Sequence, residues 1–171
     1  MPLEQLARMA GASKALIYTY FPTQYTLFNS LLDRELRSLA LAGLDTASQV
    51  NDLEQAAILC GMLYFEHVAR CGPLLHILMT DLYMSGHVDR PILETCEGAL
   101  ARLTRLATNV LPLTAAEIRA AIEMMTSIPE ESGRLVFHEE LDRTTARQIC
   151  HGLIVSSLKA LHSPDRVLSA R

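Results

Sequence analysis

Apolar residues recur at spacings of three and four along almost the whole of this 171-residue chain. The strict alternation that marks a half-buried strand is rare. A helix brings residues three and four apart onto one face, so this spacing predicts helices nearly throughout. With 50% hydrophobic residues the chain can also bury a core. We therefore expect an all-α fold.

Residues that cap and break helices divide this pattern. Short helices are expected at about 3–10 and 13–20, and Thr23 is expected to cap a long helix to about Leu41. Asn51 and Asp52 precede a helix that should end at Gly72. Further helices are expected at about 73–85, 91–110, 115–127 and 142–162, the third opened by a capping box of Thr114 and Glu117. Residues 129–141, which contain Pro129 and Gly133, are expected to be mostly loop, and the tail after Pro164 to be frayed.

The charge distribution limits how the chain could bind nucleic acid. The net charge of −4 argues against a surface that is basic everywhere. Residues 1–43 carry four basic and three acidic side chains, a net of +1, which leaves −5 for the rest of the chain. Any contact with DNA is therefore expected to be local and N-terminal.

The four cysteines indicate a reducing compartment. They are widely separated, form no C-x-x-C pair and lie in apolar helical stretches: Cys60, Cys71, Cys96 and Cys150. The N-terminus has no basic run followed by an apolar one, and no window approaches eighteen uncharged apolar residues. We expect a cytoplasmic protein with free thiols and no membrane partner.

Motifs for catalysis and for metal binding are missing from the sequence. There is no G-x-S-x-G elbow, no phosphate-binding glycine loop and no H-E-x-x-H, and the Cys and His residues lack zinc spacing. The run His138, Glu139 and Glu140 is more typical of a solvated loop than of a metal site. We expect no enzyme, no metal and no cofactor.

Residues 3–21 read as two helices around a tight turn. One apolar face of the first helix is formed by Leu3, Leu6, Ala7 and Ala10. Gly11 is suited to the left-handed conformation that ends this helix, and Ser13 can cap the second. This is the pattern of a helix-turn-helix, whose second helix enters the major groove of DNA.

Residues 11–22 read G-A-S-K-A-L-I-Y-T-Y-F-P and resemble the DNA-binding signature of tetracycline-repressor (TetR) family regulators, approximately G-V-S-K-G-T-L-Y-H-Y-F-P, at seven of twelve positions. The resemblance implies a helix-turn-helix head at residues 1–43 and a helical effector-binding and dimerisation domain at 44–171. It implies a homodimeric transcription regulator, most often a repressor, released from double-stranded operator DNA by a small apolar or amphipathic effector. The DNA-contacting residues would be Ser13, Lys14, Tyr18, Thr19, Tyr20 and Gln24.

The chemistry of these side chains suits that role. Lys14 can neutralise a phosphate, the tyrosine hydroxyls can donate to phosphate oxygens, and Thr19 can touch a base edge or a thymine methyl. The alternative for the tyrosines is ordinary packing in a small core. Where the family usually has Lys at the start of the next helix, this chain has Gln24, which weakens one phosphate contact. The usual Gly and Thr after Lys14 are Ala15 and Leu16.

The family head also has a helix before this pair, and the sequence begins at the cap of the second helix. We expect residues 1–22 to be loosely held and to bind DNA poorly without that helix. In that case the repressor prediction describes the evolutionary origin of the chain and not an activity of this polypeptide.

The remainder of the chain should hold the effector and the dimer contact. Met and aromatic side chains line adaptable cavities, so the predicted pocket residues are Met62, Phe65, His76, Met79, Tyr83 and Met124. Two late helices from each subunit would form a four-helix interface through Ala116, Ala120, Ile149, Leu153, Ile154, Ser157 and Leu161. For each residue the alternative is burial within one subunit.

Two other functions stay open on the sequence. The first is a dimeric helical small-molecule-binding protein that does not bind DNA. The second is a helical scaffold with neither ligand nor DNA, which would have no sizeable cavity.

Overall fold

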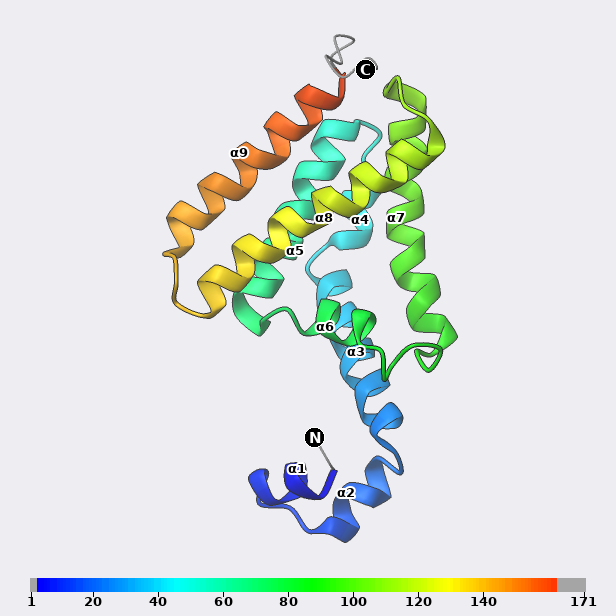
Figure 1. The fold of residues 1–171 in the computed structure, drawn as a ribbon, viewed down its shortest axis with the longest axis vertical. Coiled ribbons are helices and arrows are strands. Elements are labelled where there is room, and N and C mark those ends of the chain that lie inside the picture. Colours follow the sequence, from blue (N-terminus) through cyan, green and yellow to red (C-terminus); the bar gives the residue numbers. More distant parts are fainter. Residues whose placement is uncertain (1–2, 163–171) are drawn as a thin grey trace, which may run out of the picture. The chain divides into compact units, whose positions relative to one another are not determined.

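The computed structural model describes residues 3–162, and all of its regular structure in that range is helical (Figure 1). The expected all-α class is confirmed. In chain order the helices are α1 (Leu3–Met9), α2 (Lys14–Tyr20), α3 (Gln24–Leu41), α4 (Leu44–Ser48), α5 (Leu53–Cys71), α6 (Leu74–Thr80), α7 (Arg90–Val110), α8 (Ala115–Phe137) and α9 (Arg143–His162). No helix among the described residues is both long and apolar enough to span a bilayer.

The described residues divide into two compact units. Unit one comprises residues 3–37 and Leu74–Thr95, and unit two comprises Ser38–Pro73 and residues 96–162. The long helices α3 and α7 each begin in unit one and end in unit two. Unit one thus contains a second segment in addition to the N-terminal one. The predicted division after residue 43, between a DNA-binding head and an effector-binding and dimerisation domain, concerns function and stays a prediction.

Unit two is built around α5, α8 and α9. Figure 1 shows α8 lying across α5 with α9 beside it, and α8 packs more extensively on α5 than on α9. Their apolar stripes, together with the end of α7, form one core: Leu53, Phe65, Ala107, Leu111, Ile118, Ala146, Cys150, Ile154 and Leu158. The 3.6-residue spacing noted in the sequence is therefore the spacing of a packed interior.

The predicted caps are present at several helix starts. The Asp52 side chain accepts a hydrogen bond from the backbone N–H of Gln55 at 2.8 Å and so caps α5. Thr114 and Glu117 form the predicted capping box at the start of α8. Each cap satisfies backbone donors that have no partner inside the helix.

The expected loop at residues 129–141 is wrong over most of its length, because α8 continues to Phe137 with Pro129 inside it. Pro129 and Gly133 are both buried. A Cβ on Gly133 would lie 2.7 Å from the Val68 Cβ and 2.9 Å from the Phe65 backbone oxygen. The glycine therefore permits close packing of α8 on α5, and this tertiary contact outweighs the local tendency of both residues to end a helix.

Two helices differ from the expected pattern. Helix α6 ends at Thr80, five residues before the expected end, and the short helix α4 was not predicted. The four cysteines are free thiols; Cys60 and Cys150 are buried, and Cys71 and Cys96 are half-buried. The predicted frayed tail after Pro164 lies outside the described residues.

Candidate nucleic-acid interface

The first two helices are joined by a turn that depends on glycine. Gly11 has φ +64°, and the N–H of Ala12 donates to the carbonyl oxygen of Ala7 at 2.9 Å. This bond closes the end of α1 in the manner typical of a glycine-terminated helix. Ala7 is itself buried, as is Leu3 on the same face of α1. The chain is thereby turned sharply into α2.

Helix α2 begins at a capped position. The hydroxyl of Ser13 accepts a hydrogen bond from the backbone N–H of Leu16 at 3.1 Å. The helix ends where the N–H of Phe21 donates to the carbonyl oxygen of Ile17 at 2.8 Å. Ser13 is thus placed as predicted, at the N-terminus of a short helix that follows a turn.

The side chains of α2 are largely solvent-accessible, and none of them is buried. Tyr18 is 39% exposed and Tyr20 is 70% exposed. Lys14 and Thr19 are also exposed, although the Thr19 hydroxyl donates to the carbonyl oxygen of Ala15 at 2.9 Å. The alternative that the tyrosines fill a packed core is therefore not supported.

Lys14 has two neighbours within the α1–α2 pair. Its ammonium forms an ion pair with the Glu4 carboxylate of α1, and it lies 5.7 Å from the centre of the Tyr18 ring. The hydrogen bond and charge of Lys14 lower the pKa of Glu4, and those of Glu4 raise the pKa of Lys14. Glu4 was not among the predicted site residues, because sequence order does not show which residues of two short helices face each other.

Gln24, the last of the predicted DNA contacts, is the first residue of α3 and is half-buried. The Thr23 hydroxyl caps α3, as expected, by accepting from the N–H of Thr26 at 3.1 Å. Gln24 is thus less accessible than the predicted contacts on α2.

The first turns of α3 are held by a segment distant in sequence but in the same unit. The Tyr25 ring lies between the rings of Tyr83 and His87, with centroid separations of 4.5 and 4.0 Å. The Asn29 amide donates to the carbonyl oxygen of His87 and accepts from the N–H of Asp89, both at 2.9 Å. Stacked rings and a two-sided amide bridge together fix residues 83–89 to α3. No sequence motif indicated this cluster.

The six predicted pocket residues are divided between the two units. Phe65 is fully buried in the core of unit two, and Met62 packs against that core. Met124 belongs to the same unit but is 73% exposed, so it cannot line an enclosed cavity with them. His76, Met79 and Tyr83 belong to unit one, where Tyr83 stacks on Tyr25. The effector pocket stays a prediction.

Most of the predicted dimer residues lie at or near the surface of unit two. Ala116, Ala120, Ile149 and Leu153 are exposed, and Ser157 and Leu161 are half-buried. Ile154 is only 2% exposed and belongs to the core, so its placement at a dimer interface is wrong. Ile154 lies four residues from both Cys150 and Leu158, on the buried stripe of α9, whereas Leu153 faces about 100° away from it.

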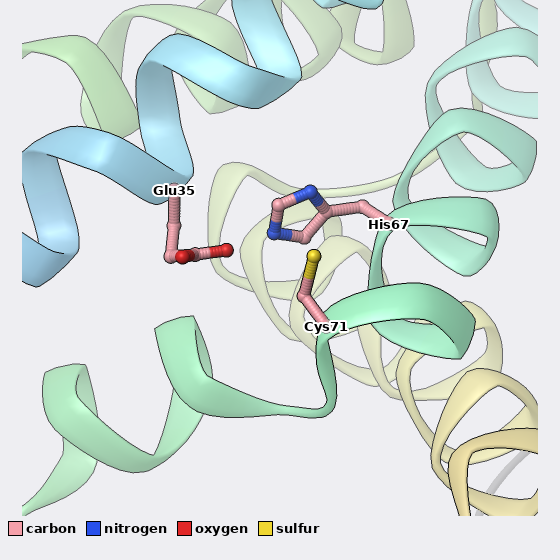
Figure 2. Close-up of side chains that lie close together, drawn as sticks. All are labelled: Glu35, His67 and Cys71. Carbon is pink, nitrogen blue, oxygen red and sulfur yellow. The ribbon is translucent and has the colours of Figure 1, made fainter. Parts of the chain in front are cut away.

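His67 and Cys71 lie one turn apart on α5 and point to the same side of that helix (Figure 2). Glu35, also drawn in Figure 2, comes from α3 and belongs to unit one. Zinc, the metal that Cys and His ligands suit best, is held by three or four protein ligands, so the two donors of α5 do not by themselves make a zinc site.

Comparison with models of known protein families gives no match, and comparison with curated proteins gives none either.

Proposed function

We propose that this chain is a transcription regulator of the TetR type, in which α1 and α2 form a helix-turn-helix that binds double-stranded DNA. The observation that carries the proposal is the capped helix α2, which follows a glycine turn and exposes Lys14, Tyr18 and Tyr20. Regulators of this kind act in the cytoplasm, where thiols stay reduced, and the four free cysteines agree with that compartment.

The exposed groups of α2 suit a duplex. Lys14 would neutralise a backbone phosphate, and the hydroxyls of Tyr18 and Tyr20 would donate to phosphate oxygens. The Thr19 hydroxyl proton is used by Ala15, which leaves the Thr19 methyl group as its most natural contact, against a thymine methyl. On this assignment the phosphate contacts set affinity, and sequence preference comes from few base contacts.

The proposal includes a homodimer, because a palindromic operator needs two heads at a fixed separation. Support comes from the exposed small and apolar side chains of α8 and α9, which include Ala120, Met124, Ile149 and Leu153. Large exposed apolar surfaces commonly mark contacts between subunits. The effector would be a small apolar or amphipathic molecule bound by residues 44–171.

A second candidate function is a dimeric small-molecule-binding protein that does not bind DNA. It is favoured by the ion pair of Lys14 with Glu4, which neutralises the main phosphate-binding charge of α2, and by Gln24 in place of a lysine. Binding of a duplex separates the two candidates directly.

The experiment is a selection of duplexes from a genomic fragment pool with the full chain, followed by titration of the selected duplex and a scrambled duplex. We expect preferential binding that weakens as salt rises. Lys14→Met should weaken binding to both duplexes about equally. Lys159→Met, which removes the other lysine of the chain from the exposed surface of α9, should leave binding unchanged. Equal binding by the two lysine variants, or no binding of any duplex, would exclude the proposal.

A further inference from the structure

The ion pair between Glu4 and Lys14 joins the two helices of the proposed DNA-binding head. Both side chains are more than half exposed, at 53% for Glu4 and 64% for Lys14, so a duplex bound at α2 could reach the pair. The Lys14 ammonium also lies over the face of Tyr18, another proposed contact. The head therefore presents its only lysine together with a carboxylate.

We propose that Glu4 competes with DNA phosphates for the Lys14 ammonium, and so sets how tightly and at what salt concentration the head binds a duplex. This inference rests on the proposed function, because it concerns the same site. Glu4 acts as a regulating residue through Lys14 and is not itself a contact to DNA.

The competition follows from elementary electrostatics. A phosphate that binds Lys14 must displace the Glu4 carboxylate, and the released carboxylate then lies close to the negatively charged backbone. Binding of Lys14 to a phosphate releases a condensed counterion, but a freed carboxylate takes up a cation in return. Glu4 should therefore lower the affinity and also flatten the dependence of affinity on salt.

The variant Glu4→Gln removes the charge and keeps the shape. We expect it to bind the selected duplex about twofold to fivefold more tightly at about 0.1 M salt, the range typical of exposed ion pairs. The slope of log K against log salt should become steeper by about 0.9, the value for one additional phosphate contact.

The matched control is Asp33→Asn. Asp33 has nearly the same side-chain exposure, 50%, and also forms an ion pair, with Arg37 four residues later in α3. Its removal changes the net charge equally but leaves Lys14 with Glu4, so the salt slope should not change. In a Lys14→Met background, Glu4→Gln should no longer steepen the salt slope, because no ammonium remains for Glu4 and a phosphate to compete for.

A measurement on the free chain tests the pair independently of DNA. The carboxyl carbon of Glu4, assigned by its loss in Glu4→Gln, is titrated by NMR with and without the duplex. Lys14 should hold the pKa of Glu4 below its ordinary value in the free chain, and the pKa should rise when the duplex binds. Circular dichroism of Glu4→Gln should show that helix content is retained.

The outcomes separate the two proposals. If the chain binds a duplex but Glu4→Gln changes neither affinity nor salt slope, the competition is refuted and the proposed function stands. An ordinary pKa for Glu4 in the free chain would refute the competition without any DNA. If neither the chain nor Glu4→Gln binds any duplex, the proposed function fails and the inference fails with it.

Discussion

Gly133→Ala tests the close packing of α8 on α5, the contact that extends α8 through Pro129. An added Cβ would lie 2.7 Å from the Val68 Cβ, 2.9 Å from the Phe65 oxygen and 3.0 Å from the Ala69 nitrogen. Two of these three atoms are backbone and cannot move as a side-chain end can. Overpacking of a core typically costs about 1–3 kcal/mol, and we expect the upper end here.

Alanine also gains about 1 kcal/mol over glycine in a helix, which leaves a net loss of about 2 kcal/mol. For a chain of this size, that loss lowers the melting temperature by roughly 4–8 °C. Urea unfolding followed by circular dichroism should show a lower midpoint with an unchanged slope.

The control is Gly98→Ala in α7, where the nearest atom to an added Cβ is the Arg102 Nη1 at 4.0 Å. With space available, Gly98→Ala should stabilise the protein by about 0.5–1 kcal/mol. If Gly133→Ala is as stable as the parent, or behaves like Gly98→Ala, the close packing of α8 on α5 does not explain why α8 continues through Pro129.

Two further predictions concern α9. Hydrogen bonds from Thr145 lower the pKa of Asp142, so the Asp142 carboxylate stabilises the fold above the ordinary pKa of aspartate, and this stability is lost as the pH falls through the lowered pKa. Asp142→Asn should therefore reduce stability at neutral pH but not in acid. An equal loss at both pH values would exclude the charge as the cause. Leu153→Glu should convert the proposed dimer to a monomer in equilibrium sedimentation, whereas Leu100→Glu, at a similarly exposed position of α7, should leave it a dimer. A parent chain that is monomeric at micromolar concentration would contradict the dimer.

Local chemistry could be predicted from the sequence, because caps and turns depend on neighbouring residues. Ser13, Asp52 and Thr114 cap the helices that they were expected to cap, and Gly11 adopts the left-handed conformation. Each of these positions is decided by hydrogen bonds to residues within five positions. Helix type and most helix ends followed from such residues.

Contacts between helices could not be predicted in the same way. The local chemistry of Pro129 predicts a helix end, and the packing of α8 on α5 explains why the helix continues. The stacking of Tyr25 between Tyr83 and His87 joins residues about sixty positions apart, and no motif announces it. The candidate site was affected likewise: the exposed lysine was identified, but its ion pair with Glu4 was not.

The face of a helix can be misassigned by a single residue. Ile154 was grouped with Ile149 and Leu153, although its spacing of four from Cys150 and Leu158 places it on the buried stripe. One position turns a side chain by about 100°, so neighbouring residues of the same type can have opposite environments.

The most direct test of DNA binding through α2 uses the two lysines of the chain, Lys14 and Lys159. The full chain is acetylated briefly with and without a saturating selected duplex, and modification at each lysine is measured by mass spectrometry. We predict that the duplex protects Lys14 and leaves the reactivity of Lys159 unchanged. Equal reactivity of Lys14 in the free and DNA-bound chain would contradict the assignment of α2 as the DNA-binding helix.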